Sequence, residues 1–395
     1  MLKLIIGLST ILASSAFAAP SDFLYVTIGS DAVGGANKSL STGKEIATSD
    51  GISVLKIHKN EVLKLSTMMH DQFNRCGGFV AHESLEEAQT VLSNSFTRKF
   101  SKSMPFLNYK IDQHDIVEPL VAQTSEYSIR AVIEKLSSFR NRYYKSQTGI
   151  DSQAWLKGKW SQLGEGRSDV KVEYFNHQKW PQPSVVMTIE GNSLKDEIVV
   201  IGGHADSIAG FWGRERAHAP GADDNASGIA TVTEVIRLAM ETGYTPERTI
   251  KFMAYAAEEV GLLGSKEIAN SYKKAGKNVV GVLQLDMTNH KGTDDLDIVF
   301  MSDYTNDAQN KFLAKLIDTY VKVPWGWSQC GYGCSDHASW HNAGFPASIP
   351  FESTMGDING KIHTKHDTIE QSGGNADHAE KFAKLAVAFM VELGK

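Results

Sequence analysis

Histidine and carboxylate side chains gather where successive strands of this 395-residue sequence are expected to end. A single aspartate before a helix is more often an N-cap than a metal ligand. Four consecutive strand ends that carry histidine, aspartate, a glutamate pair and aspartate are harder to explain in that way. The residues concerned are His204, Asp206, Asp223, Asp224, Glu258, Glu259 and Asp286, with His363 in a late loop.

These residue types suit metal-assisted hydrolysis. Imidazole and carboxylate groups are ligands of zinc, and buried carboxylates need a counter-charge that no lysine or arginine at these strand ends supplies. Peptide hydrolysis at neutral pH needs a hydroxide, and zinc lowers the pKa of the water that it binds from about 15.7 to about 7. Two ions about 3.5–4 Å apart need a bridging carboxylate, and another carboxylate within reach of the water serves as general base.

The elements that must position these residues alternate between helix and strand from about residue 111 onward. A helix is expected from Ser125, Asp151 is expected to cap the next one, and a long helix is expected at 375–393. Continuous apolar strands between helices predict a three-layer α/β/α fold with a mixed, mostly parallel sheet, whose ligand crevice lies beyond the carboxyl ends of the strands. Strands are predicted at 170–175, 184–189, 197–203, 249–255, 279–285 and 297–301.

The first part of the chain has a different character. Residues 1–18 are typical of a secretory signal peptide, because Lys3 precedes a short apolar run that ends in a small-x-small triplet. Residues 19–107 resemble a small α+β unit, a propeptide expected to be removed, with strands near 23–28 and 52–57 and a helix near 84–92. Its basic, aperiodic end looks like a cleavable linker. Residues 108–395 then form the catalytic domain of a secreted protein.

Composition narrows the possible partners. With 46 acidic against 40 basic residues, the formal charge of −6 leaves no basic surplus for a phosphate backbone, which argues against nucleic acid. No segment after the signal peptide is long and apolar enough to span a membrane.

In an exported chain, Cys330 and Cys334 of CGYGC are expected to form a disulfide, with a metal-binding pair as the alternative. Cys76 is then left without a partner.

Seven motifs, in order, resemble those of the secreted bacterial zinc leucyl aminopeptidases, the Vibrio-type family of di-zinc exopeptidases. The resemblance covers roughly residues 111–395 and implies a zinc-exopeptidase fold. It also implies a monomeric enzyme that removes leucine and other hydrophobic residues from peptides with a free N-terminus. The motifs are GGHADS (202–207), PGADDNASG (220–228), AYAAEEVGLLGS (254–265), LQLDMTN (283–289), CGYGCSDHASWHNAG (330–344), PFES (350–353) and IHTKHDT (362–368).

The resemblance implies a role for each site residue. Asp224, the second aspartate of GADD, would bridge two zinc ions, which leaves Asp223 as a neighbour. Glu258 would be the general base, and Asp206 would hold the imidazole of His204 in its ligating tautomer. The protein ligands of the two ions would be completed by His204 and Asp286 on one side and by Glu259 and His363 on the other.

The resemblance further implies an apolar pocket for the first side chain of the substrate. Without a carboxylate in its walls, a lysine or arginine side chain would be poorly compensated there. The same residues could be ordinary core. The implied walls are Met287, Met301, Cys330, Tyr332, Cys334, Ile349, Phe351, Met355, Ile358 and Ile362, and Ser335 joins them as a substrate-loop residue expected to cap a helix.

Four alternatives remain open. His337 and His341 have the spacing of a zincin helix, but Ala338 stands where that motif needs glutamate. His366 is a rival to His363 as a ligand. A single-zinc acyltransferase resembling glutaminyl cyclases, or a binding module without catalysis on the same fold, would also suit the architecture, although the complete ligand set and the glutamate pair argue against both.

Overall fold

A computed structural model of the whole chain describes all residues except 1–21, 74, 76–77, 99–105, 107–108 and 211–212. The expected signal peptide, most of the expected linker and Cys76 lie outside the described residues. None of the described helices is long and apolar enough to cross a membrane.

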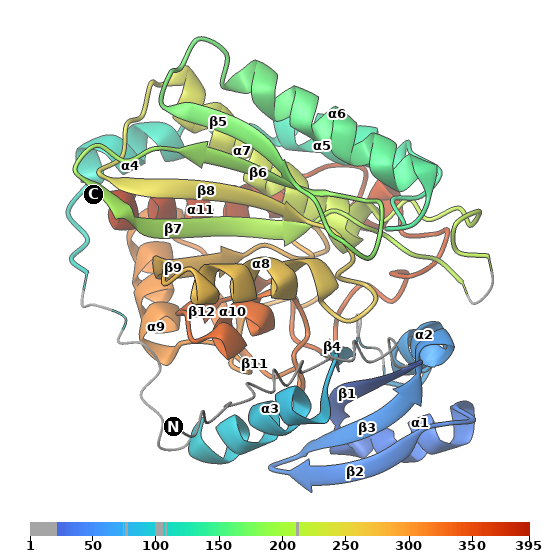
Figure 1. Cartoon of the computed structure of the whole chain (residues 1–395). Helices are drawn as coiled ribbons and strands as arrows, with labels where there is room; N and C mark the ends of the chain where they lie inside the picture. The colour runs from blue at the N-terminus through green and yellow to red at the C-terminus, as the bar shows by residue number, and fades with distance from the viewer. Residues whose placement is uncertain (1–21, 74, 76–77, 99–105, 107–108, 211–212) are drawn as a thin grey trace, which may run out of the picture.

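A six-stranded sheet forms the centre of the larger part of the molecule (Figure 1). Its order is β12-β9-β7-β8-β6-β5; the first four strands are parallel, and β6 and β5 continue antiparallel. The central strands are buried runs rich in valine and isoleucine, as a sheet covered on both faces requires. The bounds are β5 Val170–Phe175, β6 Ser184–Ile189, β7 Leu194–His204, β8 Arg248–Tyr255, β9 Asn278–Gln284 and β12 Ala347–Ser348.

Helices cover both faces of this sheet, which confirms the predicted three-layer α/β/α fold. Apolar side chains of one face pack against the first group of helices and those of the opposite face against the second. The first group is α4 His114–Val121, α5 Glu126–Ser137, α6 Gln147–Leu163, α7 Gly228–Glu241, α9 Asp307–Leu316 and α11 Asp377–Gly394; the second is α8 Leu263–Lys274 and α10 His337–Ala343. A smaller sheet, β11-β10-β13, adds β10 Ile298–Met301, β11 Trp325–Ser328 and β13 Pro350–Phe351.

Two expected helix caps are wrong. Helix α6 begins at Gln147, where the Ser146 hydroxyl accepts a hydrogen bond from the Gly149 backbone N–H, and Asp151 lies inside the helix. Asp151 instead accepts a hydrogen bond from the Gln147 side chain. Helix α10 begins after Asp336, so Ser335 lies before the cap position and its hydroxyl bonds elsewhere.

The N-terminal residues form a separate antiparallel sheet with its own helices, drawn in blue in Figure 1. The sheet order is β2-β3-β1-β4, and its apolar face packs partly on the larger part of the molecule. The predicted strands and helix of this region are confirmed. The elements are β1 Phe23–Gly29, α1 Val33–Ser39, β2 Lys44–Ser49, β3 Ile52–His58, α2 Val62–Phe73, β4 Phe79–His82 and α3 Leu85–Arg98.

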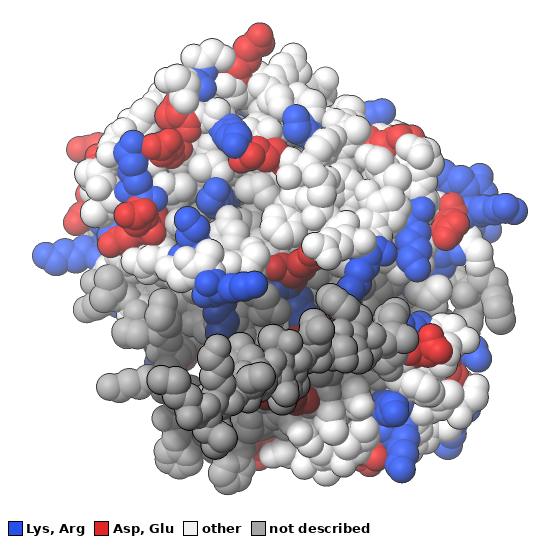
Figure 2. Space-filling model, viewed as in Figure 1, with Lys and Arg blue, Asp and Glu red and all other residues white. Residues whose placement is uncertain are grey.

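Surface charge is mixed in sign. On the face shown in Figure 2, lysine and arginine side chains are interspersed with aspartate and glutamate, and neither sign forms a continuous field. This distribution agrees with the small formal charge of the sequence.

Candidate metal centre

The parallel strands bring the predicted ligands to one edge of the sheet. β7 lies between β8 and β9, and it ends at His204. The segment after β8 carries Glu258 and Glu259, and the segment after β9 carries Asp286. Because parallel strands end at the same edge, residues more than 80 positions apart meet there.

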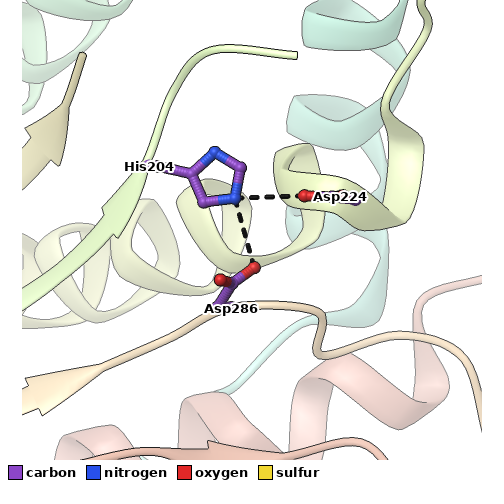
Figure 3. A group of neighbouring side chains, drawn as sticks. All are labelled: His204, Asp224 and Asp286. Carbon is purple, nitrogen blue, oxygen red and sulfur yellow. Dashed lines mark ion pairs between the residues drawn. The ribbon is translucent and has the colours of Figure 1, made fainter. Parts of the chain in front are cut away.

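The first group of side chains consists of His204, Asp224 and Asp286 (Figure 3). The Nε2 atom of His204 lies 3.0 Å from Asp224 Oδ1 and 3.3 Å from Asp286 Oδ1. All three side chains are buried. Their nitrogen and oxygen atoms therefore point at one another without access to solvent.

A second group shares Asp224 with the first. The Nε2 atom of His363 lies 2.7 Å from Glu259 Oε2 and 3.2 Å from Asp224 Oδ2. Asp224 thus turns one oxygen toward His204 and the other toward His363, and its neighbour Asp223 belongs to neither group. His366, three residues after His363, is exposed and also lies outside both groups.

Burial and charge set the protonation of this centre. Burial alone would lower the pKa of His363, but the Glu259 and Asp224 carboxylates outweigh it and raise that pKa to about 10. Burial and the Asp224 carboxylate raise the pKa of Glu259 to about 7. Against its own burial, the pKa of Asp224 is held well below the usual range by His204 and His363.

Glu258 differs from Glu259 in that neither of its carboxylate oxygens has a hydrogen-bond partner among the described residues. Its side chain is fully buried, and among the described residues no group donates a hydrogen bond to either of its carboxylate oxygens. Burial, together with the Glu259 carboxylate, raises the pKa of Glu258 well above its usual range. An orphaned carboxylate in such a place is costly unless a water molecule or a substrate completes it.

The Asp206 carboxylate organises the glutamate pair. Its two oxygens accept hydrogen bonds from the backbone N–H groups of Glu258 and Glu259, at 3.0 and 3.2 Å. The Nδ1 atom of His204 lies 3.1 Å from the backbone carbonyl oxygen of Asp206 and 3.6 Å from its carboxylate. The backbone carbonyl is therefore better placed than the carboxylate to fix the imidazole tautomer.

The two groups fit zinc. Each presents one imidazole nitrogen and two carboxylate groups within 4.8 Å of one another, and nitrogen and oxygen donors of these kinds are typical zinc ligands. Buried carboxylates of this number also need a cation to balance them.

A family model described as peptidase family M28 matches residues 184–390, which include every residue of both groups. The chain belongs to peptidase family M28. It is 40% identical over 297 residues to leucine aminopeptidase 1 of Arthroderma otae, an alignment that covers 71% of this chain and 77% of that protein. It is 32% identical to a probable aminopeptidase of Saccharomyces cerevisiae, over 87% of this chain and 92% of the relative.

Among solved structures, the LapA aminopeptidase of Legionella pneumophila superposes on this chain with a TM-score of 0.80. The two are 31% identical, and the match covers 95% of this chain and 99% of that one. These similarities confirm the predicted fold class and the prediction of an enzyme of the zinc-dependent aminopeptidase class. Membership of M28 is broader than the Vibrio-type resemblance, which stays a prediction.

The predicted pocket residues of this M28 chain lie together. All ten belong to one apolar cluster, in which Met355 is partly buried and the other nine are buried. Cys330 and Cys334 form a disulfide within the cluster.

Ser335 lies beside the metal centre instead: its hydroxyl donates a hydrogen bond to Asp286 Oδ2 at 2.6 Å. His337 is buried in α10 with its Nε2 atom 3.1 Å from the Asp303 carbonyl oxygen, away from both ligand groups.

Two residues that hold the M28 site escaped the sequence analysis. Asp367 accepts hydrogen bonds from the backbone N–H groups of Asp223 and Asp224, at 3.1 and 3.0 Å, and so fixes the loop that carries Asp224. It stands in the IHTKHDT motif, which could have drawn attention to it. Arg142 is fully buried and donates to the carbonyl oxygens of Ala205 and Gly221, but nothing in the sequence around it marks it.

Proposed function

We propose that this chain is a secreted aminopeptidase that uses two zinc ions and prefers leucine and other hydrophobic residues at the N-terminus of peptides. The observation that carries the proposal is that the two ligand groups share Asp224, each through a different carboxylate oxygen. A shared carboxylate is what a pair of closely spaced ions requires. The proposed ligands are His204 and Asp286 for one ion, Glu259 and His363 for the other, and Asp224 for both.

The zinc ions, when bound, would supply a Lewis acid that polarises the scissile carbonyl and makes water a stronger acid. Glu258 is the proposed general base. Because its carboxylate is buried and lacks a hydrogen-bond donor among the described residues, it is available to accept a proton from the attacking water. The same proton can then pass from Glu258 to the leaving amine, so that the carboxylate is regenerated. The Asp206 carboxylate holds the Glu258 backbone by accepting a hydrogen bond from the Glu258 N–H.

The proposed preference for hydrophobic residues rests on the apolar cluster beside the metal centre. Met287 directly follows Asp286 in the chain, and Ile362 directly precedes His363, so the cluster adjoins both ligand groups. None of the ten wall residues predicted from the sequence carries a carboxylate, and all ten lie together in this cluster. A cationic first side chain would therefore lose its hydration there without gaining a partner.

The proposed organisation of the precursor is a signal peptide at 1–18, a removable propeptide at 19–107 and the catalytic domain at 108–395. Contacts between the N-terminal unit and the site support a covering role. The Ser66 hydroxyl of α2 donates to the Glu259 carbonyl oxygen at 3.5 Å, and the Arg75 guanidinium lies 5.0 Å from the centre of the Tyr332 ring. The N-terminal unit therefore lies next to a proposed ligand and next to the apolar cluster.

Metal analysis of matched variants tests the proposal. The zinc-loaded protein should contain two ions per chain and hydrolyse leucyl peptides. Asp224→Asn should lose zinc and activity together, because the bridging charge is gone. Asp223→Asn, one residue away, should keep both ions. One ion per chain in the wild type would instead favour the single-zinc acyltransferase, and two ions without any peptidase activity would favour a binding module.

A further inference from the structure

A cavity of about 460 Å³ borders the proposed metal centre on the side of His363. Its lining includes Thr67, Asp71, Arg214, His363 and Lys365. None of these residues belongs to the apolar cluster proposed to hold the first side chain of the substrate. The cavity therefore offers a separate space for the part of the peptide that follows the scissile bond.

The wall of this cavity is cationic. Arg214 and Lys365 supply positive charge, and the imidazoles of His218 and His366 add further polar groups. Among the described residues that line it, Asp71 is the sole carboxylate, and Asp71 belongs to α2 of the N-terminal unit. The catalytic domain thus contributes cationic groups and no acidic side chain to this wall.

Arg214 is the group that marks the cavity as a binding site. Its side chain is only 4% exposed, and its Nε donates to the Gly210 carbonyl oxygen at 3.0 Å. Its Nη2 donates to Thr67 Oγ1 at 2.8 Å, whereas Nη1 has no hydrogen-bond partner within the part of the chain that the structure describes. Among the described residues no carboxylate forms an ion pair with this guanidinium, and a buried charge without such a partner is costly. The planar fork of Arg is suited to two parallel bonds to a carboxylate.

Two hydrogen bonds of the Gly210 backbone connect the Arg214 guanidinium with the proposed ligand His363. Gly210, which accepts from Arg214, donates its own N–H to the His363 carbonyl oxygen at 3.3 Å. The α2 residues that cover Arg214, Thr67 among them, belong to the unit proposed to be removed. Figure 1 places α2 on the side toward which β7 points. Loss of α2 would remove Leu63 and Thr67, the partners of Nη2, so that Nη2 as well as Nη1 would lack an acceptor among the described residues.

We propose that Arg214, once α2 has left, binds a carboxylate of the peptide substrate just beyond the scissile bond. This inference rests on the proposed aminopeptidase function and names the substrates that it favours. The carboxylate of a dipeptide or tripeptide follows the scissile bond closely, since each residue spans at most about 3.6 Å. A glutamate at the second residue of the peptide would place a side-chain carboxylate in the same region.

The test compares peptides that differ by one charge. The full chain is purified, loaded with zinc and cut in the segment 99–105, and removal of the N-terminal unit is verified by mass spectrometry. Leu-Gly is compared with Leu-Gly-amide, and Leu-Glu-amide with Leu-Gln-amide. The first pair reports on a terminal carboxylate and the second on a side-chain carboxylate. We expect kcat/KM to be about 10- to 100-fold higher for at least one acidic partner, mainly through KM.

Arg214→Gln should reduce that ratio to about 1, and Arg214→Lys should restore part of it. Arg216→Gln removes an exposed charge two residues away that does not line the cavity, and it should leave the ratio unchanged. Ratios near 1 in the wild type, or ratios that survive Arg214→Gln, would overturn the inference while the aminopeptidase proposal stands. Absence of hydrolysis of all four peptides would overturn both.

Discussion

Glu258 and Glu259 are neighbours in the chain, yet their carboxylates have opposite surroundings. Glu259 faces the His363 imidazole, whereas Glu258 faces no donor among the described residues. One contact holds the backbone of both residues, because the Asp206 carboxylate accepts their backbone N–H groups. Although the side chains are of the same type, Glu259 can therefore serve as the proposed ligand and Glu258 as the proposed base.

Glu258→Gln tests this division. The amide keeps the size of the side chain but cannot accept the proton, so kcat should fall by about 10²–10⁴-fold. Zinc content should not change, because Glu258 belongs to neither ligand group. Atomic absorption and the rate of leucyl-peptide hydrolysis measure the two properties on one sample. Glu165→Gln, at an exposed position, serves as the control. Loss of zinc from Glu258→Gln would assign this residue to the ligands.

Some residue roles follow from sequence and others need the fold. Spacing at strand ends, read with the family resemblance, placed the histidines and carboxylates in their groups, and Asp224 was separated from Asp223 by its place in the motif. The tautomer contact of His204 could not be predicted, because it depends on a backbone carbonyl at 3.1 Å rather than on a residue type. Arg142 could not be predicted either, since an isolated arginine in a loop is usually exposed.

Arg142 joins the loops that carry the proposed ligands. Its guanidinium donates to Ala205, directly after His204, and to Pro220 and Gly221, just before Asp224. The side chain is fully buried, and burial lowers its pKa to about 10 although nearby carboxylates such as Asp367 oppose the change. One side chain thereby fixes the distance between the end of β7 and the turn that precedes α7.

Arg142→Met should destabilise the protein by on the order of 3–5 kcal/mol, because several buried carbonyl groups lose their donor. Zinc affinity should fall as well, since the loops that carry His204 and Asp224 are no longer held at a fixed distance from each other. Thermal unfolding and competition with a chelator measure the two effects. Arg140→Met is the matched control: Arg140 is exposed, and among the described residues its side chain makes one hydrogen bond, to the Arg216 carbonyl oxygen. An unchanged zinc affinity would limit Arg142 to a structural role.

Caps were the least predictable part of the elements. The strand positions followed from apolar runs, and those runs fix which residues are buried. Asp151 and Ser335 have good cap residue types, but Ser146 begins α6 one turn earlier, and Ser335 bonds to Asp286. A local bond between Ser146 and Gly149 decided the first position, and a bond to the distant Asp286 decided the second. Residue types alone do not say which of several good cap residues is used.

A glutamate in the N-terminal unit gives that unit a dependence on pH. Glu61 is buried and accepts hydrogen bonds from the backbone N–H groups of Ser41 and Thr42 at 2.7 and 3.0 Å. Burial alone would raise its pKa, but these bonds and those from the two hydroxyls outweigh burial and lower the pKa to about 2. A carboxyl with a lowered pKa stabilises the fold above its ordinary pKa, and that stabilisation is lost as the pH falls toward 2.

Glu61→Gln should therefore cost on the order of 2–3 kcal/mol at pH 7 and progressively less below about pH 4.5. Hydrogen exchange of β1, β3 and α1, measured at several pH values, follows the stability of this unit. The wild type and the variant should converge in acid. A difference that stays constant from pH 7 to pH 3 would show that the charge of Glu61 is not what stabilises the unit.

For the molecule as a whole, the N-terminal unit and the catalytic domain share an extensive contact. The Lys266 ammonium of α8 pairs with Glu87 of α3 at 2.6 Å, and the Ala81 backbone N–H donates to the Gly261 carbonyl oxygen at 3.3 Å. Gly261 has a φ of 105° and faces Phe79 and Ala81 so closely that a side chain there would collide with them. The covering unit is thus seated by specific contacts beside the glutamate pair.

Removal of this unit should increase activity on a leucyl anilide at least about tenfold, because α2 and Arg75 then no longer cover the site. Activity is measured on the zinc-loaded full chain before and after cleavage in 99–105. A variant in which the basic residues of that segment are replaced, and which resists the protease, should remain at the lower rate. Full activity of the uncut chain would remove the inhibitory role while leaving the catalytic proposal intact.

The bond between Cys330 and Cys334 lies inside the apolar cluster and apart from the metal ligands. Reduction would therefore loosen the wall of the proposed substrate pocket and leave the proposed metal ligands in place. The reduced chain should take up zinc and hydrolyse peptides, yet distinguish leucine from alanine less sharply than the disulfide-bonded chain. The redox state of this bond would then set the selectivity of the enzyme, and titrating a reductant against the leucine-to-alanine rate ratio would reveal it.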